Sequence, residues 1–274
     1  MWVMGFARDE DLEWGPEWIE RTIQEDMIES VDPMPPLGVG RAVPEEYFER
    51  FGDVFPESVL YIWRRFGFDG FGQGRSWITD PVEWAPVVDA WLEGIELPFR
   101  PQRWHCVRRT ALGWMRLWGE LSGPAVDIDV IDGAIYPNAS VAGDMADPVL
   151  AERMGCITFT SQREDVYDDE VTGRSLAVEG IERLGVPGAD EVFGFVPPLS
   201  FGGQVSADRL SVQKAVPYLV GLAQSTPRYL GVDLMAAWGG AATQFLIDQG
   251  AIPPTNSDTS GDASTPEAPG DPGN

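Results

Sequence analysis

The chain has 274 residues, 43% of them hydrophobic, which is enough to bury the core of one large domain or two small ones. Acidic residues outnumber basic residues by 44 to 19, giving a formal net charge of −25. Such a field repels nucleic acid and anionic lipid and favours a basic partner, although plain solubility explains the same excess. No long apolar run and no signal-like N-terminus is present, so we expect a cytoplasmic protein.

The cysteines and the histidine exclude several kinds of site. Cys106 and Cys156 are too few for a disulfide framework in a chain of this size, so we expect buried free thiols. With His105 as the only histidine, too few ligands remain for a structural zinc site. Neighbours in a strand point to opposite faces, so His105 and Cys106 cannot form a nucleophile pair. We expect a core thiol and a surface or capping imidazole.

The first 59 residues predict helices separated by a linker. A helix is expected over residues 13–29, with Pro16 in its opening turn. Closely spaced prolines and glycines make residues 31–43 a linker. Pro44 and Pro56 each open a further short helix.

The stretch from Leu60 to Leu92 combines a helix end, a turn, a strand and a second helix. Gly67 can end the first helix in a left-handed conformation, and interleaved aromatics and glycines at 68–74 favour a tight loop. A short strand at 76–79 follows. Asp80 is placed as the N-cap of the second helix, which Pro86 should kink or restart.

Beyond Gly94 the pattern changes to period two. Strands are predicted over residues 104–109, 114–118, 126–130 and 134–136, and Asp132-Gly133 is a strong hairpin signal. We expect an α+β fold in which helices pack on an antiparallel meander sheet, followed by a smaller, mainly helical α+β C-terminal unit.

The second half predicts shorter elements. These are a helix at 147–155, a strand at 157–160, a helix at 173–184, a strand at 192–196, a helix from 206 bent at Pro217, and a helix at 232–249. The composition after residue 250 is typical of disorder. The expected organisation is an N-terminal helix and linker (1–42), an α+β domain (43–143), a C-terminal domain with a helical extension (144–250) and an acidic tail (251–274).

Two groups of carboxylates are candidates for a functional site. Asp127 and Asp129 share a strand face near Asp132, an arrangement that could hold a divalent cation or divide acid and base roles. The commoner cause is the solvated face of an antiparallel strand. The acidic run at 164–170 lacks the ligand spacing of an EF-hand and is better explained by a solvated loop or a patch for a basic partner.

The first half resembles the GAD-like domain family. The residues that carry this resemblance are Val43 to Tyr47, Trp63, Phe66 to Phe68, Gly72 to Gly74, Trp77, Asp80, Pro81, Trp84, Trp91, Leu92, Arg109 to Gly113 and Leu117 to Gly119. Leu112 and Trp114 depart from the family pattern, which often has phenylalanine and an acidic residue there.

The second half is similar to the domain that commonly follows it, long classed as a domain of unknown function. The matching residues are Gly180 to Leu184, Asp190 to Pro197, Leu199, Gly202, Gly203, Leu210, Val212 to Val216 and Leu222 to Gln224. The residues after Gln224 have no counterpart. Together the two resemblances cover residues 43–224.

The paired resemblance implies an immunity protein. Such proteins are encoded beside toxic DNase effectors of type VI secretion and protect the producing cell by binding the toxin, without chemistry, cofactor, nucleic acid or membrane. An acidic inhibitor suits a basic nuclease groove. The residues that we expect to face the toxin are Asp165, Asp168, Asp169, Glu170, Asp69 and Gln73. The alternatives are an enzyme using Asp127, Asp129 and Asp132 with a metal, and an acidic scaffold with no toxin partner.

Overall fold

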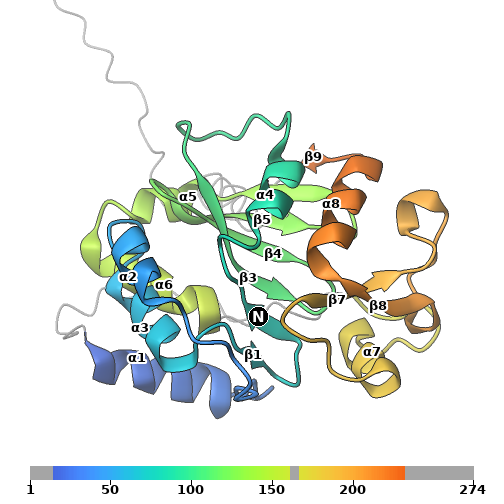
Figure 1. Cartoon of the computed structure of the whole chain (residues 1–274), viewed down its shortest axis with the longest axis horizontal. Coiled ribbons are helices and arrows are strands. Elements are labelled where there is room, and N and C mark those ends of the chain that lie inside the picture. The colour runs from blue at the N-terminus through green and yellow to red at the C-terminus, as the bar shows by residue number, and fades with distance from the viewer. Residues whose placement is uncertain (1–14, 161–166, 232–274) are drawn as a thin grey trace, which may run out of the picture. The chain divides into compact units, whose positions relative to one another are not determined.

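The structure is a computed structural model that describes residues 15–160 and 167–231. All of these residues belong to one compact unit (Figure 1). Its helices are α1 (Pro16–Ile23), α2 (Glu45–Phe51), α3 (Glu57–Phe66), α4 (Ala85–Leu92), α5 (Ala139–Asp144), α6 (Pro148–Thr160), α7 (Leu176–Leu184) and α8 (Ala215–Ser225). Its strands are β1 (Gly70–Phe71), β2 (Ser76–Ile78), β3 (Trp104–Thr110), β4 (Met115–Gly119), β5 (Gly123–Asp129), β6 (Ala134–Pro137), β7 (Glu191–Phe195), β8 (Leu210–Lys214) and β9 (Tyr229–Leu230).

Within the described residues, seven strands form one sheet in the order β1-β2-β3-β4-β5-β6-β9. Each neighbour from β1 to β6 is antiparallel, which confirms the predicted meander, and β9 adds in parallel to β6. The predicted hairpin at Asp132-Gly133 joins β5 to β6, and Gly133 has the positive φ of 75° that this turn requires. Strands β7 and β8 form a separate antiparallel pair. The α+β fold is therefore confirmed.

Helices cover both faces of the meander (Figure 1). On one face, α1, α3 and α6 pack against Val107 and Trp118. On the other face, α4 and α8 pack against Cys106 and Leu117. Because strand neighbours point to opposite faces, one strand contributes to both cores. A smaller third core joins Leu112 of the β3–β4 turn to α7, β7 and β8.

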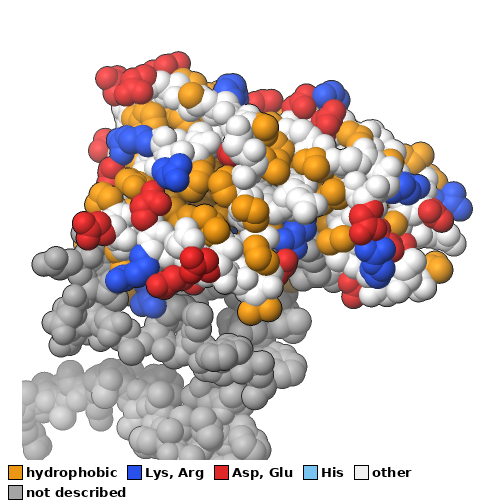
Figure 2. Space-filling model, turned by 90° about the horizontal axis from the view of Figure 1, so that it is seen from below, with side chains coloured by type: hydrophobic (Ala, Val, Ile, Leu, Met, Phe, Trp, Pro, Cys, Tyr) orange, Lys and Arg blue, Asp and Glu red, His pale blue; other side chains and the backbone are white. Residues whose placement is uncertain are grey.

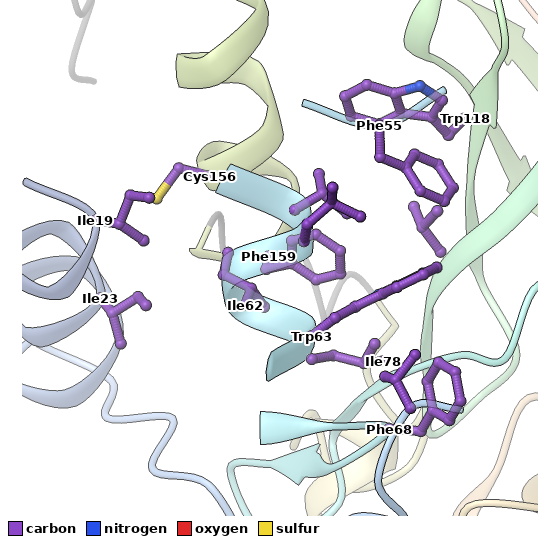
Figure 3. Close-up of a cluster of buried hydrophobic side chains, with 14 of the residues drawn as sticks. Ile19, Ile23, Phe55, Ile62, Trp63, Phe68, Ile78, Trp118, Cys156 and Phe159 are labelled. Carbon is purple, nitrogen blue, oxygen red and sulfur yellow. The ribbon is translucent and has the colours of Figure 1, made fainter. Parts of the chain in front are cut away.

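Aromatic rings dominate the core beneath α3. Trp63 is 1% exposed, and its ring centroid lies 5.8 Å from Phe51, 5.1 Å from Phe55 and 5.8 Å from Phe68. These approaches are tilted edge-to-face contacts, the geometry that aromatic quadrupoles favour. Figure 3 shows Trp63 with Phe55 and Phe68, and Cys156 of α6 pointing toward Ile19 of α1. Both cysteines are buried free thiols, as predicted.

The wet strand face predicted for Asp127 and Asp129 is not present. Strand β5 is covered by α4 and α8 on the Val126 and Ile128 side and by α5 and α6 on the other. Asp127 is half-buried in its pairing with Arg116, and Asp129 is 7% exposed. Apolar and polar residues do alternate along β5, but its polar face is covered by α5 and α6, whose position the sequence alone did not predict.

Two predicted elements in the second half are wrong. Residues 157–160 continue α6 as helix, because Cys156 and Phe159, three apart, both enter the core under α1 and α3. The helix predicted from residue 206 divides into β8 and α8. Leu210 to Lys214 pair with β7 as an antiparallel strand, and Pro217 lies in the first turn of α8, where its missing N–H breaks no helical bond.

The N-terminal predictions agree with the structure in part. Asp80 Oδ1 accepts hydrogen bonds from the backbone N–H groups of Val82 (2.9 Å) and Glu83 (3.2 Å), but it caps a turn at 81–84 and not the helix for which it was predicted. Helix α4 then begins at Ala85, with Pro86 in its first turn. The helix predicted over residues 13–29 is formed by α1 and a π-helical continuation, Gln24–Ile28.

The predicted helix at 232–249 and the predicted tail at 251–274 lie outside the described residues. The division at residues 42, 143 and 250 remains a prediction. Among the described helices, none has the length and apolar character that a membrane span needs.

We predict that Trp63→Ala lowers the free energy of unfolding by about 3–5 kcal/mol, because it removes a ring packed on three others and leaves a cavity. Chemical denaturation with urea measures the change. Val31→Ala is the control, since Val31 is fully exposed and its truncation should stay within about 0.5 kcal/mol. A similar small loss for both variants would contradict the packing described here.

Candidate binding surface

Asp169 is buried, at 2% exposure, inside a loop of the second half. Its Oδ1 accepts hydrogen bonds from the backbone N–H groups of Val171 (2.7 Å) and Thr172 (2.9 Å). Its Oδ2 accepts from the Ser206 hydroxyl (2.9 Å) and the Ala207 N–H. These bonds, led by those from the Ala207 and Thr172 backbone, hold the pKa of the Asp169 carboxyl well below its usual range. Asp169 therefore joins two loops and does not offer its carboxylate to a partner.

The acids on either side of Asp169 are exposed. Asp168 pairs through its backbone with Ser175, and the Glu170 N–H donates to the Val205 carbonyl (3.3 Å), so both side chains stand on a fixed backbone. Asp165 lies outside the described residues. Of the predicted acidic run, the structure thus places Asp168 and Glu170 on the surface and Asp169 beneath it.

Asp69 and Gln73 belong to the glycine-rich stretch around β1. Asp69 is 2% exposed and accepts hydrogen bonds from the N–H groups of Gly38 (2.8 Å), Val39 (3.1 Å) and Gly70 (2.8 Å). It attaches the linker to the sheet edge and, like Asp169, has a structural role. Gln73 is exposed at the tip of the following turn, in the left-handed region with φ 61°.

The carboxylates of the predicted metal or acid–base cluster have other partners. Asp127 accepts two hydrogen bonds from Arg116, at 2.8 and 3.0 Å. Asp129 accepts from the Tyr167 hydroxyl (2.7 Å) and from the N–H groups of Ile131 and Asp132. Burial raises the pKa of Asp129. In the described residues, no three His, Cys, Asp or Glu side chains converge as metal ligands would.

His105 and Cys106 point to different environments, as expected for strand neighbours. Burial raises the pKa of the Cys106 thiol to about 12, so it has little thiolate character near neutral pH. His105 is not the surface or capping imidazole that we predicted. Its ring lies 5.3 Å from that of Phe51, its Nε2 is 3.2 Å from Glu120, and its burial lowers its pKa.

An open groove of about 530 Å³ lies between the turn that carries Gln73 and helix α7. We call it the seam groove. Its lining residues are Asp32, Pro33, Pro35, Gly72, Gln73, Arg75, Val178, Ile181 and Glu182. Sequence reasoning selected only Gln73 from this set. The prolines of the linker and the outward positions of α7 gave a signal of surface location, but not of proximity to one another.

Glu182 also lines a second hollow of about 380 Å³, which extends past Val171 and Asp208. Those two residues in turn line a third hollow of about 480 Å³ that includes Glu170. The seam groove is thus continuous, through shared residues, with the surface around the predicted acidic run. Val171 is 85% exposed, an apolar side chain within this acidic surface.

Comparison with known families identifies two domains in the chain. Residues 24–132 match the family model of the GAD-like domain, and residues 159–225 match that of the C-terminal domain of the type VI secretion system (T6SS) immunity protein Tdi1. Both resemblances derived from the sequence are therefore confirmed. The seam groove takes one wall from each matched region. No curated protein matches the chain.

A solved structure shares the fold. The crystal structure of Atu4351 from Agrobacterium tumefaciens matches with a TM-score of 0.58 and 20% sequence identity, over 73% of this chain and 88% of that one. At this identity the likeness establishes the fold alone.

We predict that Asp169→Asn destabilises the protein at pH 7, because an amide cannot accept all the hydrogen bonds that the carboxylate accepts. A folded-state pKa below the ordinary aspartate value of about 3.9 means that the stabilisation is present above that value and is lost as the pH falls toward the folded pKa. The stability gap between wild type and variant should therefore narrow between about pH 5 and pH 3.

Urea unfolding at these two pH values measures the gap. Asp168→Asn, next to it and exposed, is the matched control and should change stability little at either pH. A gap for Asp169→Asn that stayed constant or widened on acidification would show that the carboxylate does not hold the two loops together.

Proposed function

We propose that this chain, which joins a GAD-like domain to the C-terminal domain of a T6SS immunity protein, binds and neutralises a secreted antibacterial toxin. The match of residues 159–225 is the observation that carries the proposal. The described structure supports neutralisation by binding, since its buried carboxylate groups and its thiols serve the fold. Asp69, Asp129 and Asp169 cap backbone turns, and both cysteines are buried.

The toxin that we propose is a nuclease. A nuclease needs cationic side chains where it holds phosphates, and the net charge of −25 on this chain would attract such a surface. Opposite charge raises association rates, and salt weakens the effect. An inhibitor of this kind needs no cofactor and no contact with nucleic acid.

We place the acidic contact at Asp168 and Glu170, together with the neighbouring Asp165 of the same run. Asp168 and Glu170 are exposed, and the backbone that carries them is held by the buried Asp169 carboxylate and by the Val205 carbonyl. A held backbone lowers the entropy cost of ordering the contact when the toxin binds. Asp69 and Asp169 drop out of the contact set because they are buried.

Co-expression tests the proposal. The product of the gene next to that of this chain is expressed in a bacterial host, with and without this chain, while growth and DNA integrity are scored. We expect growth arrest and DNA breakage without the chain, and rescue together with a complex that co-purifies at moderate salt. A harmless neighbour, or toxicity that the chain does not relieve, would overturn the proposed function.

A charge-reversal pair tests the acidic contact. We predict that Asp168→Arg with Glu170→Arg slows association with the toxin by about tenfold or more, with a weaker salt dependence, because rim charges act mainly on the association rate. Stopped-flow or surface-binding kinetics measure both rates. Glu46→Arg with Glu49→Arg on α2 makes the same change of net charge on exposed residues and should slow association much less. If both pairs slowed association equally, the net charge of the whole protein would account for the effect, and the contact at Asp168 and Glu170 would be wrong.

A further inference from the structure

The seam groove is built from parts of the chain that lie more than 100 residues apart. One wall consists of the linker at Asp32 to Pro35 and the turn at Gly72 to Arg75, both within the GAD-like match. The other wall is the outer side of α7, within the immunity-domain match. The groove therefore exists only when the two matched domains are packed together.

Arg75 makes the first wall rigid. Its guanidinium donates to Asp32 Oδ1 (3.0 Å) and the Pro33 carbonyl (3.2 Å), and its Nε donates to the Gly72 carbonyl (3.1 Å). Gly72 has a φ of +56°, which strains any other residue, and a Cβ there would displace the Met34 side chain, whose sulfur would lie 2.1 Å away. This wall is formed before any partner arrives.

The second wall is the outward side of an amphipathic helix. Leu176, Ala177 and Gly180 of α7 are buried, whereas Val178 and Ile181 are partly exposed toward the groove. Glu182 stands at the margin, where its carboxylate accepts from Arg174 at 2.7 Å.

The turn also contacts the segment that follows α7, because a Cβ on Gly74 would lie 2.6 Å from Val186 Cγ1. The two walls thus touch at one end and fix the width of the groove.

The lining combines apolar surface with carboxylates on both walls. Pro33, Pro35, Val178 and Ile181 supply the apolar part. Asp32 and Glu182 are 60% and 56% exposed. Arg75 is only 11% exposed, so the charged atoms that a bound segment would reach are the carboxylates of Asp32, which pairs with Arg75, and of Glu182, which pairs with Arg174. Figure 2 shows the side of the molecule on which α1, β1 and α7 lie, where hydrophobic side chains are interspersed with charged and uncharged ones.

Gln73 sits between two glycines at the tip of the first wall. Its φ of 61° belongs to the left-handed region, where glycine is relaxed and a side chain is strained. The side chain is exposed, so core packing does not account for it. Strained residues of this kind occur at binding sites, where the retained side chain has a use.

We propose that the seam groove receives a segment of the toxin in which an apolar side chain is flanked by Lys or Arg. The apolar side chain packs on the prolines and on α7, the flanking cations meet Asp32 and Glu182, and the Gln73 amide binds the segment backbone. This assignment rests on the proposed function and adds the place and chemistry of contact. Each matched domain supplies one wall.

The test uses full-length protein with Gln73→Arg and Glu182→Gln combined. The first change puts a cation into the groove and the second removes one carboxylate while keeping an acceptor for Arg174, so the fold is preserved. We expect affinity for the neighbouring gene's product to fall roughly tenfold or more, and rescue of growth to weaken. Calorimetry and the co-expression assay measure the two effects, and unchanged thermal unfolding confirms the fold.

Glu46→Arg is the matched control, because it makes the same change of net charge on α2, which lies apart from α7 in Figure 1. Gln73→Gly is a second variant, which removes the side chain and relaxes the backbone. It should weaken binding without lowering thermal stability. Rescue and affinity that both variants leave at the wild-type level would overturn the groove assignment while the proposed function stands. Absence of rescue by the wild type would overturn the proposed function itself.

Discussion

Two adjacent buried arginines in β3 join the parts of this molecule. Because strand neighbours point to opposite faces, Arg108 donates to the Thr158 carbonyl of α6 (3.2 Å), while Arg109 donates to the carbonyls of Gly188 (2.6 Å) and Ala189 (3.1 Å). Burial lowers the pKa of both guanidiniums to about 9, which leaves them charged near neutral pH. A buried charge must find partners, so the strand fixes a helix on one side and the segment after α7 on the other. The seam groove depends on this second attachment.

The acidity of the chain has two separate roles. Asp69 and Asp169 are inside, where each carboxylate accepts several backbone N–H groups and fixes a loop. Asp168 and Glu170 are outside, on backbone that Asp169 holds. Net charge therefore sets the sign of the charge that the molecule attracts, while burial decides which carboxylates are exposed. The buried Asp169 carboxylate thus also fixes the backbone on which the exposed Asp168 and Glu170 side chains stand.

The proposed binding surface is shared by two matched domains, which suits the proposed role of an inhibitor that recognises one toxin. Long-range charge speeds the encounter with any basic protein, but it discriminates poorly. A groove with fixed walls, apolar lining residues and carboxylates at set positions adds discrimination, because a poorly fitting segment leaves its own cations without partners. Rigid walls also reduce the ordering cost of binding. In the described structure, the seam groove between α7 and the linker and Gln73 turn combines rigid walls with apolar and acidic side chains.

The sequence by itself determined the elements whose signals are local. The Asp80 turn cap, the start of α4 at Ala85 beside Pro86, the Asp132-Gly133 hairpin and the alternating strands of the meander follow from side-chain geometry within a few residues. The motifs also identified both domains.

Only the tertiary structure decided what distant segments do to one another. It covered the polar side of β5 with α5 and α6, kept residues 157–160 helical through core packing, buried Asp69 and Asp169, and brought α7 to the Gln73 turn. Local pattern carries no record of which surfaces meet, because burial and proximity arise from packing between elements far apart in the chain.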